Sequence, residues 1–380
     1  MISVITTPYP SPSSCIHPFI HFDKPIMSSA LSRIRGSLLG GACGDALGYP
    51  VEHKTMDAIR KLYGETGLQE METRDGVAVV TDDTQMTIYT AQGLLYAGEK
   101  HCDYEGTVRE VHKSYLRWIA SLLPTEDVPS RYEHLYPREE LLRNELLENG
   151  ANPGLDKKMC RGGSTFRALL SGKMYSVSDP ADEGVRCGTT MRSAPIAIYC
   201  FKNPTLAFRL GRDCAALTHG YASAYLAAGV MCMVIARLIE GSEMKEAIDE
   251  SLAYLKTQED GEELYDVLMK GVELSSHPSE RPFDDIKTIG LGWRADENLA
   301  IAFYCCLRFG RDVKSALLAC VNHDGDSDSV AAVCGNIMGA YVGEEGLPPD
   351  FVSSVQFREL ICEQANSLYS CAVSSLPSSS

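Results

Sequence analysis

Residues 31–48, with the sequence LSRIRGSLLGGACGDALG, decide the fold class of this chain. Their apolar positions recur at intervals of three and four residues: Leu31, Ile34, Leu38, Ala42 and Ala46. This spacing places them on one face of an α-helix. Similar spacing dominates the rest of the chain, and regular alternation of apolar and polar residues is hard to find. The sequence therefore predicts an all-α fold.

Four glycines recur at every fourth position of the same stretch: Gly36, Gly40, Gly44 and Gly48. They would form one bare ridge along the helix, because residues four apart lie one above the other. Glycine inside a helix costs about 1 kcal/mol relative to alanine. We therefore expect a neighbouring backbone to approach this ridge closely. The alternative is a distorted or broken segment.

Further helices are expected over residues 86–97, 104–121, 166–170, 205–216, 221–239, 244–255, 262–274, 297–309, 313–321 and 330–342. Gly, Pro and Asn punctuate the stretches between them, at residues 149–154 and 276–282 for example, and neither stretch is long enough to link independent domains. We therefore expect one compact orthogonal helical domain over residues 28–370. Residues 1–27 are expected to be a disordered extension, with Met27 as an alternative start, and residues 371–380 a disordered tail.

The composition excludes some classes of function. The chain has 380 residues, a hydrophobic fraction of 44% and a formal net charge of −16. Binding nucleic acid through its phosphates needs clustered Lys and Arg, so we expect no nucleic-acid partner. An acidic enzyme that acts on a small anion must concentrate cations locally, and bound metal ions would do so.

We expect the protein to be a monomer.

Three features indicate the cytoplasm. The 14 Cys residues are scattered without the paired spacing of a zinc site, so we expect reduced thiols, many of them in apolar runs such as that around Cys232. Residues 1–25 lack the apolar stretch of a secretory signal. Residues 221–239 are the candidate membrane span, but Ser223 and Arg237 within them favour a buried central helix.

The strongest chemical signal is the run NHDGDSDS over residues 322–329, in which carboxylates alternate with small and hydroxyl residues before an apolar helix. Such acids repel one another unless a cation binds, and oxygen ligands suit Mg²⁺, Mn²⁺ or Ca²⁺ rather than Zn²⁺. A helix-loop-helix calcium loop is excluded, because Ser329 stands where that loop needs Gly and Gly335 stands where it needs Glu. A solvated turn that caps the next helix remains an alternative.

A second acidic turn, Thr81-Asp82-Asp83-Thr84, also precedes a predicted helix. Taken alone it can be an N-cap followed by acids that the helix dipole favours. If the two helix starts pack together, they gather four or five carboxylates around one cavity. That arrangement can hold two ions, so we expect a binuclear metal site at converging helix N-termini.

The chain resembles the ADP-ribosylglycohydrolases, a metal-dependent helical family that includes the dinitrogenase reductase-activating glycohydrolase of bacteria. The resemblance runs from Arg35 to Gly343, over several motifs in order: residues 36–48 with Glu52, residues 81–84, RGGST at 161–165, GTTMR at 188–192, LTH at 217–219, Gly292-Trp293, and residues 326–329.

The resemblance implies that two divalent cations, Mg²⁺ or Mn²⁺, bind in this chain. The ligands would be Thr81, Asp82, Asp83, Asp326, Asp328 and Ser329. It also places Glu52 near the metals, on a segment that can move. Asp82 or Asp83, and after them Glu52, would move the proton between water and leaving group.

The resemblance also implies a cleft for ADP-ribose. It would be lined by Gly162, Gly163, Ser164, Gly188, Thr189, Met191 and His219, with Arg192 as a helper. Amides at a helix N-terminus favour anions, which suits the diphosphate, although ordinary turn chemistry explains the same glycines. Many relatives have Asn where this chain has Cys187, so contacts to the distal ribose can differ. Arg294 follows Trp293 and would face either the cleft or solvent.

We therefore expect a hydrolase that cleaves the glycosidic bond between ADP-ribose and an acceptor, with ADP-ribosyl-arginine on proteins favoured because Ser329 resembles the arginine-directed members. The partner would be an ADP-ribosylated protein or a small ADP-ribose conjugate. A two-metal pyrophosphohydrolase of nucleotide sugars and an inactive ADP-ribose-binding relative are the alternatives.

Overall fold

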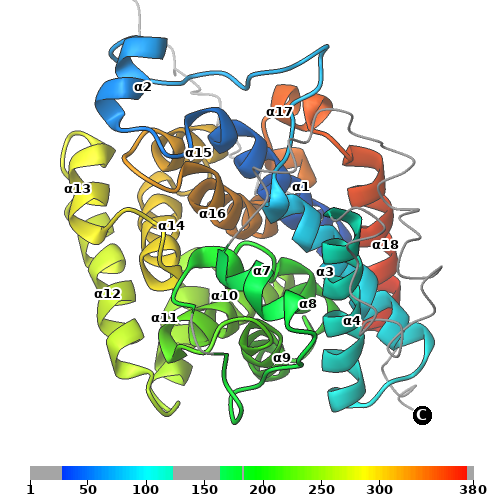
Figure 1. Ribbon diagram of the computed structural model, residues 1–380. Helices are drawn as coiled ribbons and strands as arrows, with labels where there is room; N and C mark the ends of the chain where they lie inside the picture. The colour runs from blue at the N-terminus through cyan, green and yellow to red at the C-terminus, as the bar shows by residue number, and fades with distance from the viewer. Residues whose placement is uncertain (1–27, 123–162, 182–183, 375–380) are drawn as a thin grey trace, which may run out of the picture.

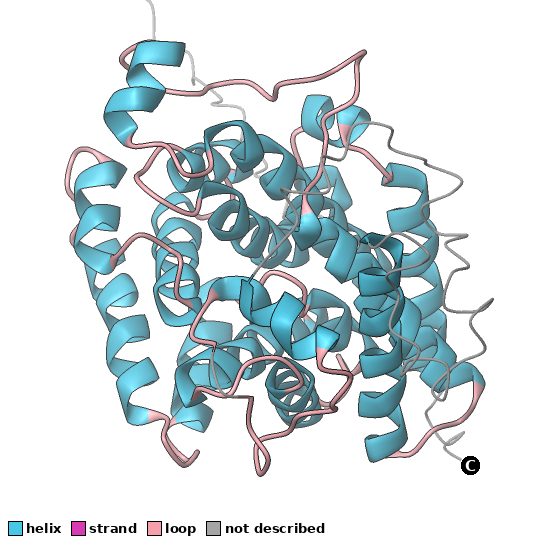
Figure 2. Cartoon of the chain, in the orientation of Figure 1, coloured by secondary structure: helices cyan, strands magenta, loops and turns pink. Residues whose placement is uncertain are grey.

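A computed structural model describes residues 28–122, 163–181 and 184–374. Within these residues the backbone forms helices and three isolated β-bridges but no strand, which confirms the all-α prediction (Figures 1 and 2). In chain order the helices are α1 (Ala30–Gly48), η1 (Tyr49–Val51), α2 (Met56–Tyr63), α3 (Asp82–Glu99), α4 (Tyr104–Leu122), α7 (Gly163–Leu170), η4 (Cys187–Thr189), α8 (Ala194–Tyr199), α9 (Pro204–Ala216), α10 (Ala222–Glu240), α11 (Met244–Leu255), α12 (Glu262–Ser276), α13 (Pro282–Ile289), α14 (Ala295–Phe309), α15 (Val313–Val321), α16 (Ser327–Val342), η5 (Glu344–Gly346), α17 (Pro349–Ser354) and α18 (Arg358–Ser374).

The predicted helices are all present, and α11 and α15 have the predicted bounds. Among the described residues, five α-helices were not predicted: α2, α8, α13, α17 and α18. The last of these carries helical structure four residues beyond the expected end of the domain at residue 370. The expected extension over residues 1–27, and residues 375–380 of the expected tail, lie outside the described residues.

Helices α1 and α16 pack with their backbones in direct contact. A Cβ built on Gly40 would lie 2.3 Å from the carbonyl oxygen of Gly335, and one on Gly44 would lie 2.0 Å from that of Ala331. The approach is mutual, because a Cβ on Gly335 would lie 2.0 Å from the carbonyl oxygen of Gly40. The glycine ridge therefore exists to admit a neighbouring backbone, as the sequence predicted.

The other helices surround this pair. Helix α10 lies in the lower half of Figure 1, beside α9 and α11. Among the described residues it alone is long and apolar enough to cross a membrane, yet 89% of its most apolar window is buried inside the fold. Its role as a buried core helix is therefore confirmed.

Cysteines contribute to this core as small apolar residues. Those in the described part of the chain are free thiols, and most of them are buried, including Cys232 on α10. Their burial agrees with the prediction that many of these cysteines pack in apolar surroundings.

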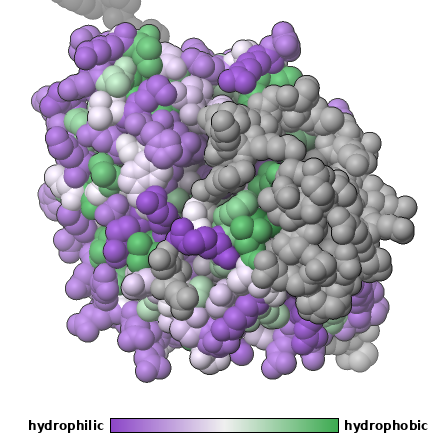
Figure 3. Space-filling model, viewed as in Figure 1, coloured by the Kyte–Doolittle hydropathy of each residue, from purple (hydrophilic) through white to green (hydrophobic). Residues whose placement is uncertain are grey.

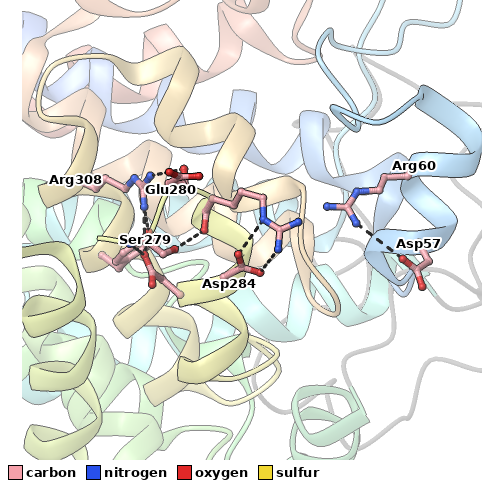
Figure 4. A network of polar contacts seen from close by, with 9 residues as sticks. Asp57, Arg60, Ser279, Glu280, Asp284 and Arg308 are labelled. Atoms are coloured by element: carbon pink, nitrogen blue, oxygen red, sulfur yellow. Dashed lines mark hydrogen bonds and ion pairs between the residues drawn. The ribbon is translucent and has the colours of Figure 1, made fainter. Parts of the chain in front are cut away.

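Polar contacts hold α13 against α14 at the edge of the fold (Figure 4). Arg308 of α14 donates to the side chain of Asp285 at 3.2 Å and to the backbone carbonyl of Glu280 at 3.2 Å. Arg281 makes two hydrogen bonds to Asp284, at 2.9 and 3.0 Å. Figure 3, which has the orientation of Figure 1, shows mostly hydrophilic residues over the left side of the molecule, where Figure 1 places α12 and α13.

Replacing Gly44 by Ala tests the contact between α1 and α16. The new Cβ would collide with the backbone of Ala331, which cannot move aside as a side chain can. We expect the free energy of unfolding to fall by about 3 kcal/mol, measured by urea denaturation.

The matched control is Gly98→Ala near the end of α3, where the nearest atom to a new Cβ is the Cys371 sulfur at 3.2 Å. This change should be neutral or stabilising by up to about 1 kcal/mol, because alanine favours helices. Equal stability changes in the two variants would contradict the role assigned to the ridge.

Candidate active site

The two acidic motifs meet at the N-termini of α3 and α16. Thr81 is the N-cap of α3 and Asp326 is the N-cap of α16. Asp83 of the first motif contacts the hydroxyl of Ser329 in the second. Carboxylate oxygens of Glu52, Asp326 and Asp328 lie within 4.8 Å of one another. The predicted convergence of the two motifs is therefore present in the fold.

Helix α1 delivers one more carboxylate, Asp45, which sequence reasoning did not assign to the site. Asp45 is fully buried and accepts hydrogen bonds from the backbone N–H and hydroxyl of both Thr81 and Thr84, at 2.5 to 3.1 Å. Asp45 on α1 therefore fixes the position of the first turn of α3. A signal was available, because Asp45 is the only acid in its helix and lies among the small and apolar residues of the helix's second half, where a buried carboxylate must find partners.

The glycine contact between α1 and α16 ends at the acidic cluster. A Cβ on Gly48, the last residue of α1, would lie 2.4 Å from the Cα of Asp328. The chain then passes through η1 directly to Glu52. Close packing of the two helices thus brings Asp45 and Glu52 to the start of α16.

The segment after Glu52 is fixed by contacts with the late acidic run. The N–H of His53 donates to the carbonyl of Gly325 at 3.2 Å, and the N–H of Met56 donates to Asp324 Oδ1 at 2.6 Å. His53 Nε2 lies 3.0 Å from Glu52 Oε1, and the His53 ring stacks on Trp293 with centroids 4.6 Å apart. These contacts hold Glu52 beside the acids Asp326 and Asp328, and its side chain is 22% exposed.

Burial raises the pKa of every carboxyl group in the cluster. The pKa of Asp82 rises to about 7 and that of Glu52 to about 8, first because of burial and then because of neighbouring acids. The pKa values of Asp83 and Asp328 are also raised well above their ordinary range, with burial as the largest cause. Like charges in a poorly solvated site cannot all ionise unless a cation compensates them.

These residues fit a hard divalent ion. Asp83 is buried and its Oδ2 atom has no hydrogen-bond partner, so one carboxylate oxygen is left for an ion. The donors around it are mostly carboxylate and hydroxyl oxygens, which suit Mg²⁺ and Mn²⁺. The Thr81 hydroxyl donates to Asp45 and accepts from the N–H of Asp83, which leaves one lone pair.

A thiol lies beside these oxygens. The Cys187 thiol is 8% exposed and donates to Asp326 Oδ2 at 2.8 Å. Its Sγ lies 3.6 Å from the Ser329 hydroxyl oxygen. Burial and the nearby Asp326 raise the pKa of Cys187 well above its ordinary value, so the thiol is protonated when no cation is bound. Cys187 therefore contacts Asp326, one of the predicted metal ligands.

The loop over residues 187–192 lines the other side of the cluster. Met191 is buried, and the Ser329 hydroxyl lies 3.9 Å from its sulfur. The Thr189 hydroxyl donates to the Ala224 carbonyl at 2.9 Å, and the Thr189 carbonyl accepts from the Ser193 hydroxyl at 2.6 Å, so this buried residue fixes the loop. A Cβ on Gly188 would lie 3.0 Å from the Thr165 hydroxyl, so the start of α7 adjoins this loop.

The remaining predicted cleft residues have different environments. Gly163 is exposed and begins α7, and Ser164 is half-buried beside it, whereas Gly162 lies outside the described residues. His219 is buried beneath Gly188, and burial lowers its pKa to about 3. His219 is therefore neutral and supports the loop from below.

The two arginines left open by the sequence are both engaged. Arg192 is buried, donates to the Thr218 hydroxyl at 2.7 Å, and lies 4.4 Å from the centroid of the Tyr115 ring. Its charge opposes the rise in the pKa of Asp82. Arg294 pairs with Asp296 at 2.6 Å and with Glu263 at 3.3 Å, so its charge is compensated outside the acidic cluster.

A pocket of about 330 Å³ opens beside Glu52. It is lined by residues of two segments: Ala46, Tyr49, Pro50, Glu52, His53, Lys54, Glu72, Thr73, Arg74, Val77 and Val79. Its volume falls within the range of small-molecule sites. Polar and charged side chains of both signs face it, so a polar group can approach Glu52 from this side.

The sequence model of the ADP-ribosylglycohydrolase family matches residues 27–375. The chain belongs to this family. Membership supports hydrolysis of ADP-ribosyl glycosidic bonds in general, and the acidic cluster of Glu52, Asp326 and Asp328 is the possible metal site.

Named relatives are similar along most of their length. The chain is 24% identical to the ADP-ribosylhydrolase ARH3 of Xenopus tropicalis, with 87% of this chain and 93% of the relative covered. It is 23% identical to the ADP-ribosyl-[dinitrogen reductase] glycohydrolase of Rhodospirillum rubrum, over 87% and 92%. It is 22% identical to the ADP-ribosylarginine hydrolase Tri1 of Pseudomonas putida, over 90% and 78%.

A solved structure titled ADP-ribosylglycohydrolase-related protein complex has the same fold. It superimposes with a TM-score of 0.59 at 24% identity, and the match covers 90% of this chain and 99% of that one. At this identity the likeness concerns the fold alone.

Replacing Asp45 by Ala tests how α3 is held. The change leaves the N–H groups and hydroxyls of Thr81 and Thr84 without their acceptor in the core. We expect a loss of roughly 2 to 4 kcal/mol in unfolding free energy, measured by urea denaturation. The control Asp103→Ala removes an exposed acceptor at the start of α4, which binds the N–H of Gly106, and should cost about 1 kcal/mol. A smaller loss for Asp45 than for Asp103 would refute its structural role.

The raised pKa values predict how stability depends on pH without metal. Between about pH 6.5 and 8, folded Asp82 and Glu52 keep protons that their unfolded forms, with pKa near 4, have lost. Stability should therefore fall as pH rises through this window. Below about pH 6.5 the buried histidines act in the opposite sense, because burial lowers the pKa of His112 and His323 to about 4 and that of His219 to about 3.

The measurement is the melting temperature of chelator-treated protein at several pH values in this window. Saturating Mg²⁺ should remove the fall, and Glu52→Gln should reduce it. An unchanged melting temperature from pH 6.5 to 8 in chelator-treated protein would be inconsistent with protonated acids in the cluster.

Proposed function

We propose that this chain is a metal-dependent hydrolase that cleaves the glycosidic bond between ADP-ribose and an acceptor, preferably an arginine side chain of a protein. One observation carries the proposal. In a member of the ADP-ribosylglycohydrolase family, the Thr81 turn and the Asp326 run meet at one buried cluster of acids.

The proposed cofactor is a pair of divalent cations, Mg²⁺ or Mn²⁺. Thr81, Asp82, Asp83, Asp326, Asp328 and Ser329 would hold the ions, and Glu52 lies within reach of the same place. Such ions, when bound, polarise substrate oxygens and lower the pKa of bound water.

Side chains of this protein would handle the proton in hydrolysis. Asp82 and Glu52 have pKa values of about 7 and 8 without an ion, so each can gain or lose a proton near neutral pH. Asp82 is half-buried at the first position of α3, and Glu52 faces the pocket beside η1. In the proposed reaction one of these acids takes the proton from water while another supplies one to the leaving group.

Two observations support arginine as the acceptor and protein as the substrate class. The late acidic run ends in Ser329, as in the arginine-directed members that this chain resembles. One relative is named for ADP-ribosylarginine, and another is named for an ADP-ribosylated dinitrogen reductase. We further propose that the protein acts as a monomer in the cytoplasm.

Asp326→Ala and Asp82→Ala test the metal centre. Each removes a carboxylate from the cluster, so each should lose at least one ion and turnover should fall by about a thousandfold or more. Metal content is measured by elemental analysis, and turnover by release of ADP-ribose from an ADP-ribosylated peptide. Asp284→Ala, which removes a solvent-facing acid from α13, is the control and should change neither quantity. Full metal occupancy with normal turnover in either cluster variant would overturn the proposal.

The reaction products test the chemistry and the acceptor. The wild-type protein is incubated with peptides ADP-ribosylated on arginine or serine, with O-acetyl-ADP-ribose and with poly-ADP-ribose, with and without Mg²⁺. Free ADP-ribose released fastest from the arginine peptide supports the proposal. Release of AMP would indicate a pyrophosphohydrolase, and tight ADP-ribose binding without release would indicate an inactive relative.

A further inference from the structure

Cys187 places a thiol next to the carboxylates of the acidic cluster. Its Sγ lies 2.8 Å from Asp326 Oδ2 and 3.6 Å from the Ser329 hydroxyl oxygen, and the side chain is 8% exposed. The thiol therefore faces the same carboxylate that belongs to the group formed with Glu52 and Asp328. Asp326 therefore has the Cys187 sulfur and the carboxylate oxygens of Glu52 and Asp328 as neighbours.

A second observation shows that one carboxylate oxygen beside Asp326 has no partner within the described part of the protein. Asp83 is 3% exposed, it contacts Ser329, and its Oδ2 atom has no hydrogen-bond partner. A buried carboxylate oxygen without a donor is costly, and an ion between Asp83 and Asp326 would remove that cost. Cys187 and Asp83 both neighbour Asp326 and Ser329, so the thiol lies where an ion is needed.

We propose that Cys187 and Asp326 bind a thiophilic divalent ion, Zn²⁺ or Cd²⁺, at this centre in competition with the hard ion. This inference rests on the metal site of the proposed function but not on the reaction assigned to it. Hard ions are held by oxygen and gain little from sulfur, whereas Zn²⁺ and Cd²⁺ bind thiolate strongly. The consequence is inhibition: a thiophilic ion would occupy the centre and exclude the ions that support hydrolysis.

The geometry needs only a small adjustment. Ligand distances of about 2.3 Å to sulfur and 2.0 Å to oxygen place the two ligand atoms roughly 3.5 Å apart on a tetrahedral ion. Sγ and Oδ2 are 2.8 Å apart while they share a hydrogen bond, so they must separate by less than about 1 Å. The thiol proton that Asp326 now accepts leaves to solvent as the metal–sulfur bond forms. No electron is transferred.

The test is a titration of chelator-treated, full-length protein with CdCl₂. The thiolate-to-cadmium charge-transfer band in the ultraviolet reports the metal–sulfur bond directly, independently of hydrolysis. Wild-type protein should develop the band with the first equivalent of Cd²⁺, and excess Mn²⁺ should displace it because both ions need Asp326. The band should be lost in Cys187→Ser, with Cd²⁺ affinity reduced on the order of tenfold or more. Cys362→Ser, which removes a half-buried thiol from α18, is the matched control and should keep the band.

Mn²⁺ binding, measured by calorimetry on the same samples, separates the possible failures. Cys187→Ser that binds Mn²⁺ but gives no band supports the inference and shows that the variant is folded. A band that persists in Cys187→Ser, or that Mn²⁺ does not displace from wild-type protein that binds Mn²⁺, overturns it. If wild-type protein gives the Cys187-dependent band but binds no Mn²⁺, the thiol site stands and the proposed hydrolase centre fails.

Inhibition of Mg²⁺-supported turnover should need at least about ten times more Zn²⁺ in Cys187→Ser than in wild type.

Discussion

The backbone contact between α1 and α16 is the constraint on which the site depends. Glycines on both helices allow an approach that any side chain would block. This approach places Asp45 under the start of α3 and brings the end of α1 against Asp328. Because the two backbones are in direct contact along the glycines, the acids at the end of this contact are held close together despite their repulsion. Close packing therefore opposes electrostatic repulsion in this fold.

The negative charges of the acidic cluster are not balanced by positive groups of the described residues. Within the described part of the chain, Arg192 is a cation whose charge lowers the pKa of Asp82, and it lies among Tyr115, Thr218 and Met86. The helix N-termini of α3 and α16 contribute partial positive charge near Asp82 and Asp328, which lie in the first turns of these helices. Together these do not compensate the acids, whose pKa values remain raised by burial. The remaining charge is what a divalent ion would supply.

The sequence predicted much of the fold and the outline of the site, because those features have local signals. The glycine ridge, the buried α10 and the two acidic turns at helix starts were all visible as spacing or composition. Helix α18 was missed although its buried Ile361, Ala365 and Leu368 have helical spacing, because alanine and Gln364 give its apolar stripe little contrast. Helix α18 continues to Ser374, four residues past the expected domain end at residue 370.

Other parts of the site depend on tertiary contacts that have no local signal. The late acidic run illustrates this, since it holds the Glu52 segment as well as offering ligands. The side chain of Asn322 pairs with both the N–H and the carbonyl of Leu68 at 2.8 Å, and Asp324 accepts from the N–H of Met56. A carboxylate in this run is therefore not a ligand merely because it is acidic: Asp324 is used as an anchor for α2, whereas Asp326 and Asp328 face Glu52. Because anchor and ligands alternate along one short run, an ion bound at Asp326 would act on the segment that carries Glu52 as well as on the acids around it.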